Sequence, residues 1–122
     1  MTDADSSRLA NEVWEQLSAR MARTVDGVDF GRMMSSPGLV WKDDKGRSRV
    51  FCFHNPSGKF AGMGFRLGRQ FDAAKAGLEN CAVLSPFQSK PPLYDWFVVP
   101  ASECNHWPDL AQRALRFMQG SK

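Results

Sequence analysis

Two clusters of turn-forming residues divide the middle of the chain into short apolar segments, and they constrain its fold more than any other feature. The clusters are Asp43–Gly46 and Asn55–Gly58, and each ends in a glycine. Such residues close tight turns, because Pro fixes φ and Gly accepts a positive φ. Apolar and aromatic residues fill the neighbouring segments Gly38–Trp41, Arg47–His54 and Lys59–Leu67. The spacing predicts an antiparallel meander of about three strands.

The last of these strands alternates apolar residues with glycine. Because successive side chains of a strand point to opposite faces, the two residue types lie on different sides of the sheet. Gly62 and Gly64 have no side chain to pack, which predicts a bulge or a close approach of another backbone. The other face is expected to enter the core, and its residues are Ala61, Met63, Phe65 and Leu67.

Amphipathic helices are predicted near both ends of the chain. The first runs from about Ser6 to Arg23, where apolar residues recur at helical spacing. The second begins near Trp107, and Pro108 suits its first turn because the missing amide proton is not needed there. The apolar stripes contain Leu9, Ala10, Val13, Trp14, Leu17 and Met21 in the first helix, and Trp107, Leu110, Ala111, Ala114, Leu115 and Met118 in the second.

The remaining segments are interpreted from their local composition. Thr24–Asp29 is predicted to be a connection, and Arg69–Ala76 a short helix that ends at Gly77. Residues 78–92 are predicted to be irregular, because their prolines confine the backbone to extended conformations. Tyr94–Val99 is mostly apolar, which indicates a central strand.

The order of these elements predicts an α+β fold in which helices pack on an antiparallel sheet. The chain has 122 residues, of which 43% are hydrophobic and 24% charged, as expected of one domain spanning residues 1–122. These values exclude a repeat array, a coiled coil, a membrane protein and a multidomain enzyme. The three cysteines are odd in number and widely spaced, and the N-terminal residues are acidic, which favours a reduced cytoplasm.

Two Cys-x-His pairs, Cys52 with His54 and Cys104 with His106, are the candidate metal ligands. Residues two apart on a strand share a face, so Cys52 and His54 could both reach one metal ion. Familiar zinc sites use longer spacings within a pair, however. The alternative is that the cysteines are small hydrophobic residues in or near the core. The spacing favours this alternative, and neither a metal nor another cofactor is predicted.

Catalytic motifs are missing from the sequence. It contains no Gly-x-Ser-x-Gly elbow, no phosphate-binding loop and no Gly-x-Gly-x-x-Gly motif. The adjacent carboxylates Asp43 and Asp44 lie in a turn cluster, where such residues are turn formers. The sequence therefore favours a protein without enzymatic activity.

Basic residues are concentrated between Trp41 and Gln70, although the whole chain has a formal net charge of only +3. A basic sheet with exposed aromatic residues binds nucleic acid through phosphate contacts and base stacking. The alternative is a solvated face whose aromatic residues turn inward. The basic residues of this region are Lys42, Lys45, Arg47, Arg49, Lys59, Arg66 and Arg69, and its only acidic residues are Asp43 and Asp44.

Four alternating residues of the strand 47–54 leave open which face of this strand is buried. They share one strand parity, so they cannot all enter the core. Either the aromatic residues lie on a partly exposed face, or a partner or helix covers one end of that face. The four residues are Arg47, Arg49, Phe51 and Phe53.

Several short segments occur in an order that resembles the TfoX N-terminal-domain family and the related MmcQ/YjbR-like proteins. The resemblance extends from about Phe30 to Met118. In place of the family's Phe-Gly-x-Pro-Gly motif the chain has Met34-Ser-Ser-Pro-Gly38. The segments that carry the resemblance are Gly31–Leu39, Val50–Phe53, Phe65–Leu67, Ser85–Pro100 and Trp107–Ala111.

The resemblance implies N- and C-terminal helices packed on a curved antiparallel sheet, similar to secretion-chaperone folds. It implies a binding role and supplies no catalytic residues. If the sheet curves in this way, Lys90 on its proline-stiffened loop lies near Arg32, Arg66 and Arg69, where the group could bind an anion or an acidic peptide. The alternative is that the prolines only orient the following strand and that Lys90 is solvated.

The predicted function is a cytoplasmic binding or interaction domain, monomeric or homodimeric, with a protein or anionic partner and no membrane. One alternative is a nucleic-acid-associated regulatory protein that uses the basic sheet. Another is a metal site or an enzyme at Cys52 and His54. The candidate binding residues are Arg32, Arg47, Arg49, Arg66, Arg69 and Lys90.

Overall fold

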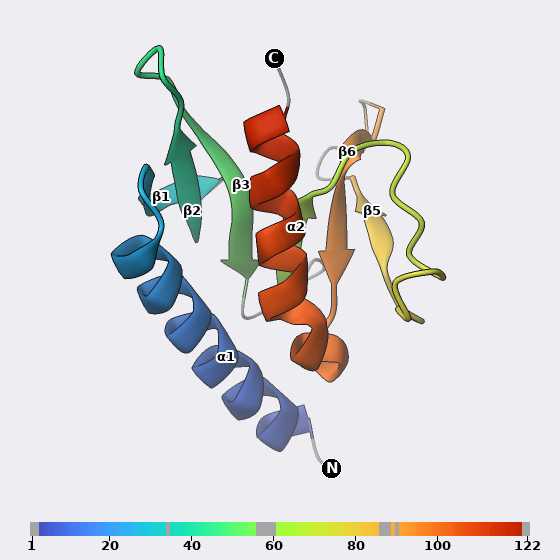
Figure 1. The fold of residues 1–122 in the computed structure, drawn as a ribbon. Coiled ribbons are helices and arrows are strands. Elements are labelled where there is room, and N and C mark those ends of the chain that lie inside the picture. The colour runs from blue at the N-terminus through green and yellow to red at the C-terminus, as the bar shows by residue number, and fades with distance from the viewer. Residues whose placement is uncertain (1–2, 34, 56–60, 86–88, 90, 121–122) are drawn as a thin grey trace.

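The computed structural model describes residues 3–33, 35–55, 61–85, 89 and 91–120. Its strands form one antiparallel sheet in the order β1-β2-β3-β4-β6-β5, and the N- and C-terminal helices lie in front of it (Figure 1). This confirms the predicted α+β class. The elements are α1 (Asp3–Thr24), β1 (Val28–Met33), β2 (Ser36–Lys42), β3 (Ser48–Asn55), β4 (Gly62–Arg66), β5 (Ala82–Leu84), β6 (Leu93–Val99), the 3₁₀ helix η1 (Ala101–His106) and α2 (Trp107–Gly120).

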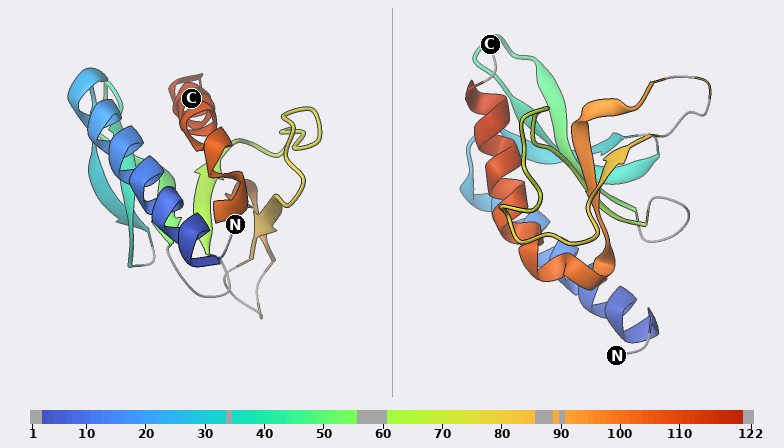
Figure 2. Two further views of the ribbon diagram at one scale, coloured as in Figure 1. Left: turned by 90° about the horizontal axis from the view of Figure 1, so that it is seen from below. Right: turned by 90° about the vertical axis from the view of Figure 1, so that its right-hand side faces the viewer.

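Both helices pack on the same face of the sheet (Figure 2). In α1, residues three or four positions apart are buried, because one turn of an α-helix returns each of them to the same side. Trp107 opens α2 and is fully buried, and Pro108 occupies the first turn as predicted. No helix among the described residues is long and apolar enough to cross a membrane. The buried positions of α1 are Ala10, Trp14, Leu17, Ser18 and Met21.

The face of the sheet toward the helices forms the main core. Leu39, Cys52, Phe65 and Phe97 are paired from strand to strand across β2, β3, β4 and β6, and all are buried. Paired residues point to the same face, so this row meets the apolar stripes of α1 and α2. Burying a large apolar side chain stabilises a fold by roughly 1.5–3 kcal/mol. The predicted inward face of β4 is confirmed at Met63 and Phe65.

The opposite face carries a second, smaller cluster organised around Phe53. Its neighbours across β2 and β4 are Gly38 and Gly64, and the Phe53 ring occupies the space where a Cβ of Gly64 would lie. At Gly64 the approaching group is therefore a side chain, and the predicted close approach of another backbone is confirmed only at Gly62. Gly62 has a φ of +129° and lies against the backbone of Val99, which leaves no room for a Cβ. The cluster comprises Phe53, Leu84, Trp96 and Val98, with Met33 and Val50 packed against it.

A β-bulge in β3 places Phe51 and Phe53 on opposite faces of the sheet, whereas the sequence predicts that they share one face. Leu39 pairs with Cys52, whereas the next residue, Val40, pairs with Val50, so Phe51 is an extra residue in its strand. Phe51 consequently joins the helix-side core while Phe53 faces the other way. Both rings are buried, with exposed fractions of 0% and 2%. The expectation that the two aromatic residues share one face is wrong.

Three segments differ from the predicted elements. The expected connection at residues 24–29 already contains the start of β1, which pairs with β2, and the expected irregular segment contains β5, which pairs with β6. Arg69–Ala76 does not form a helix. It forms successive turns instead, in which the Ala76 amide donates to the Asp72 and Ala73 carbonyls and the Leu78 amide to the Ala73 carbonyl. Phe71 packs against Phe97 at a ring distance of 5.1 Å. A helix as short as the predicted one is not stable by itself. The packing of Phe71 on β6 therefore determines the conformation of this segment.

Candidate anion-binding site

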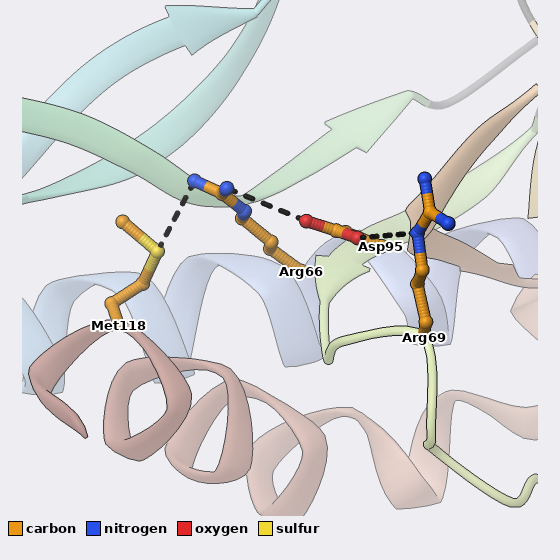
Figure 3. Close-up of polar contacts among 4 residues, drawn as sticks. All are labelled: Arg66, Arg69, Asp95 and Met118. Carbon is orange, nitrogen blue, oxygen red and sulfur yellow. Dashed lines mark hydrogen bonds and ion pairs between the residues drawn. The ribbon is translucent and has the colours of Figure 1, made fainter. Parts of the chain in front are cut away.

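Two arginines converge on one carboxylate where β4 ends beside β6. The amides of Leu67 and Gly68 both donate to the backbone carbonyl of Asp95, at 2.9 and 3.1 Å, so the chain leaving β4 is fixed to β6. Gly68 has a φ of +87°, a conformation that favours glycine, and Arg69 follows this turn. Asp95 then lies between the side chains of Arg66 and Arg69 (Figure 3).

Arg66 is held by several weak contacts rather than by one strong ion pair. Its Nη2 lies 3.4 Å from the Asp95 Oδ2, and its Nη1 lies 3.6 Å from the Met118 Sδ on α2. The guanidinium is also 6.0 Å from the ring centre of Phe117. Its Nε is buried and has no hydrogen-bond partner in the part of the chain that the structure describes. A buried donor without an acceptor costs about 1–3 kcal/mol, so this end of the Arg66 side chain is held at a cost to stability.

Arg69 forms the open side of the site. Its side chain is 75% exposed and its guanidinium lies 5.3 Å from the ring centre of Tyr94. The 3.8 Å ion pair between its Nε and Asp95 is exposed, and such pairs contribute little to stability. Between the two arginines lies a shallow cleft of about 290 Å³, here called the arginine cleft. Its lining residues are Arg66, Arg69, Pro92, Leu93, Tyr94, Asp95 and Trp96.

The other predicted binding residues lie elsewhere. Arg32 is on β1, which β2 and β3 separate from β4. Arg47 is exposed beside the turn between β2 and β3, and Arg49 is half-buried in β3 opposite Trp41. Lys90 lies outside the described residues, as do residues 56–60 with the end of the second turn cluster. Of the five candidates that the structure describes, only Arg66 and Arg69 are therefore brought together.

The first turn cluster is a self-contained hairpin tip. One carboxylate oxygen of Asp43 accepts the amides of Lys45 and Arg47, each at 2.9 Å. The hydrogen bond from the Arg47 amide is the main reason why the pKa of Asp43 is lowered. This confirms Asp43 as a turn former. Among the described aromatic residues near this tip, Phe51 and Phe53 are buried and the half-buried Trp41 packs against the core, so they offer little stacking surface.

The cysteines are placed as core or near-core residues. All three are free, Cys52 and Cys104 are buried, and Cys81 is half-buried. Burial raises the pKa of each thiol, and together with the charge of Glu103 it raises the pKa of Cys81 to about 11. Thiols of this kind are poor nucleophiles at neutral pH, because the thiolate is the reactive form. Within the described residues, no three His, Cys, Asp or Glu side chains are grouped as metal ligands.

His54 joins both helices to the sheet. Its ring stacks on Trp14 of α1 at 5.6 Å and meets Trp107 of α2 edge-on at 5.7 Å. Its exposed fraction is 5%, and burial lowers its pKa because the charged imidazolium is disfavoured there. We call Trp14, His54 and Trp107 the His54 junction. Its position inside the core identifies His54 as a structural residue.

Glu103 is a buried polar residue that the sequence analysis missed. Its two carboxylate oxygens accept the amides of Glu79 and Asn80, each at 2.8 Å. These bonds fix the end of the segment 67–81, which begins beside Arg69, against η1. The two amides are more than twenty positions from Glu103 in the sequence, so no local sequence pattern indicates the contact. Glu103 therefore anchors the segment just before β5.

Comparison of the chain with protein-family models, with curated proteins and with solved structures finds no match. The candidate site is therefore assigned from its own geometry.

Proposed function

We propose that the protein is a cytoplasmic binding domain without enzymatic activity, and that it holds an acidic segment of a protein partner in the arginine cleft. The observation that carries this proposal is that two guanidinium groups, those of Arg66 and Arg69, share the single carboxylate of Asp95 beside the cleft. A second carboxylate entering the cleft would balance the remaining positive charge. The resemblance to the TfoX N-terminal-domain family agrees with a binding role and stays a prediction.

The charges of the cleft suit a carboxylate. Arg66 and Arg69 share the single carboxylate of Asp95, which leaves one positive charge unbalanced at this position. Guanidinium groups bind carboxylates with charge-assisted hydrogen bonds, and a partly enclosed site strengthens these bonds. The exposed side chains of Leu93 and Tyr94 add apolar surface beside the charge. A peptide with acidic and apolar side chains matches both properties.

Nucleic acid fits this surface less well. Base stacking needs exposed aromatic rings. Phe51 and Phe53 are buried, and Phe30, which is 56% exposed, lies on β1 outside the β2–β3 hairpin. The Tyr94 ring is exposed, but Arg69 already lies against it. The basic residues of the hairpin and those of the cleft are on different parts of the sheet. We therefore argue for an acidic peptide and treat binding of an oligonucleotide as an outcome of the test.

The test is an NMR titration of the ¹⁵N-labelled protein with a blocked hexaglutamate peptide. We expect the side-chain Nε–Hε signals of Arg66 and Arg69 and the amide signals of residues 93–96 to shift together. Replacing Arg69 with Ala should weaken binding about tenfold, the loss expected for one charge-assisted contact. The matched control is Arg47→Ala, which removes an exposed arginine outside the cleft and should leave the affinity unchanged.

Three results would overturn the proposal. They are a peptide that shifts no signal, a peptide that shifts signals of the β2–β3 hairpin instead of those of the cleft, and an equal loss of affinity in both arginine variants. A parallel titration with a single-stranded oligonucleotide at the same salt concentration provides the comparison. Tighter binding of the oligonucleotide than of the peptide, centred on Arg47 and Arg49, would support the nucleic-acid alternative and contradict the acidic-peptide proposal.

A further inference from the structure

One side of α1 carries a row of residues spaced alternately by four and three positions. This is the heptad spacing, at which the side chains of one helix stay in line with a second helix packed along it. The row is apolar at its N-terminal end, has a glutamine in the middle and is basic at its C-terminal end. Val13 packs against the core, so the row borders the buried stripe of α1. We call it the α1 seam, and it consists of Leu9, Val13, Gln16, Arg20 and Arg23.

A groove of about 700 Å³ runs between the α1 seam and the first turns of α2. All seam residues except Leu9 line it, and so do the buried side chains of Leu17 and Met21. The two helices diverge from the start of α2 onward, which leaves this side of α1 open (Figure 1). The α2 side of the lining consists of Pro108, Asp109 and Gln112.

The length of the groove and the spacing of its wall suit a helix. From Val13 to Arg23 the seam rises by about 15 Å at 1.5 Å per residue, which is about three turns of helix. An amphipathic helix binds such a groove through side chains three and four positions apart, the same spacing as in the α1 seam. Leu9 lies one turn before Val13 on the same side of α1 and is 43% exposed, so a slightly longer helix would also cover it.

The charge of the groove favours acidic residues on that helix. Arg20 and Arg23 are exposed, and neither takes part in the ion pairs found in the part of the chain that the structure describes. On the opposite wall, the carboxylate of Asp109 is already paired with the Nε of Arg113 at 3.1 Å. The groove therefore offers two unbalanced positive charges next to the apolar surface of Val13.

A second copy of α1 does not match this pattern. In an antiparallel pair centred on Gln16, the two arginines of one chain would face the apolar Leu9 and Val13 of the other. In a parallel pair each arginine would face its own copy, and like charges placed opposite each other disfavour association. Neither arrangement gives the arginines a carboxylate. The α1 seam is thus not complementary to itself, which favours a different chain as the occupant.

We propose that the α1–α2 groove binds an acidic amphipathic helix of a protein partner. Apolar side chains of that helix pack on Val13 and Leu17, and its carboxylates pair with Arg20 and Arg23. Arginine binds a carboxylate with two parallel hydrogen bonds, so these pairs also fix the position of the helix along the groove. The groove shares no lining residue with the arginine cleft, and the proposal does not depend on that cleft.

The test is an NMR titration of the ¹⁵N-labelled protein with a blocked helical peptide of about two heptads that has leucine at positions a and d and glutamate at positions e and g. We expect the amide signals of residues 13–23 and 109–112 to shift. Arg20→Glu and Arg23→Glu should each weaken binding at least about tenfold, because an attraction becomes a repulsion. A peptide with glutamine in place of leucine should also bind at least about tenfold more weakly, because it lacks the apolar face.

Arg116→Glu is the matched control. Arg116 is an exposed arginine of α2 that does not line the groove, so the same change of charge there should leave the affinity unchanged. A second peptide carries lysine in place of glutamate. It should bind the double variant Arg20→Glu/Arg23→Glu more tightly than the wild-type chain, the reverse of the order for the acidic peptide. Circular dichroism confirms that each variant is folded.

Four results would overturn the proposal. They are an acidic peptide that shifts no signal of the groove, an equal loss of affinity in Arg116→Glu, a lysine peptide that binds the wild-type chain as tightly as the acidic peptide does, and a wild-type dimer in sedimentation that Arg20→Glu dissociates. The last result would assign the groove to a second copy. Shifts confined to residues 93–96 would place the peptide in the arginine cleft, which contradicts the groove as the site and supports the proposed function.

Discussion

The His54 junction and the arginine cleft both place nitrogen-bearing side chains against aromatic rings, but only one of them leaves binding capacity open. His54 is 5% exposed between two tryptophans, whereas the Arg69 side chain is 75% exposed over Tyr94. At the junction, packing is complete and burial keeps the imidazole neutral. In the cleft, two guanidinium groups share one carboxylate and one buried nitrogen has no partner among the described residues. The junction is therefore a structural site because it is buried. The cleft is a candidate binding site because it is open and its positive charge is not balanced.

The largest expected effect is at the junction. Trp107 is fully buried, its ring meets His54, and its Nε1 donates to the Val99 carbonyl at 3.3 Å. Replacement by Ala should lower the free energy of unfolding by about 3–5 kcal/mol, as expected for a buried aromatic residue. Urea unfolding measures the loss. A decrease below about 1 kcal/mol would show that the junction does not hold α2 on the sheet.

An intermediate effect is expected at Glu103, which binds the amides of Glu79 and Asn80. In Glu103→Gln, one oxygen becomes an amide group that faces the donor it formerly bound. The variant should lose about 1–3 kcal/mol of stability, and hydrogen exchange at the amides of Glu79 and Asn80 should accelerate. Glu79→Gln is the control, because that side chain is exposed and its change should cost less than about 0.5 kcal/mol. Equal effects of the two variants would contradict an anchoring role for Glu103.

The smallest expected effect is a pH dependence that comes from His54. Burial lowers its folded-state pKa, whereas an unfolded histidine titrates near 6.5. Between these two pKa values the unfolded chain binds more protons. The contribution of His54 is therefore fully present above about pH 6.5 and is lost as the pH falls through the folded-state pKa. Unfolding free energies between pH 5.5 and 7.5 should show this decline, and His54→Phe should flatten it. A decline of the same size in the variant would assign it to other groups.

Periodic segments could be predicted from the sequence, and local departures from periodicity could not. The stripes of α1 and α2 and the alternation in β4 repeat over enough residues to indicate both the element and its buried side. The bulge at Phe51 inserts a single residue and has no sequence signal of its own. The strand β5 has only three residues, and its formation depends on pairing with β6.

The candidate site shows the same division. Arg66 and Arg69 could be named from the sequence because the basic residues of that region are numerous. Asp95 could not be paired with them, since it is 29 positions from Arg66 and meets it only through the pairing of β4 with β6. Arg47 and Arg49 looked equivalent in the sequence, but the hairpin leaves them apart from the cleft. The number of basic residues thus indicates the region between Trp41 and Gln70. Only the pairing of β4 with β6 shows that Arg66 and Arg69, and not Arg47 and Arg49, form a site with Asp95.

The most direct test of the account is the affinity for the hexaglutamate peptide, measured by isothermal titration calorimetry on the wild-type chain and on Asp95→Asn. Asp95 is the carboxylate that now occupies the two arginines, so removing its charge should release them and tighten binding by about three- to tenfold. Arg69→Ala, measured alongside, should weaken binding. Opposite changes in affinity in these two variants are expected only if the peptide competes with Asp95 for the arginines. If Asp95→Asn binds the peptide no better than the wild-type chain, the arginine cleft is not the binding site.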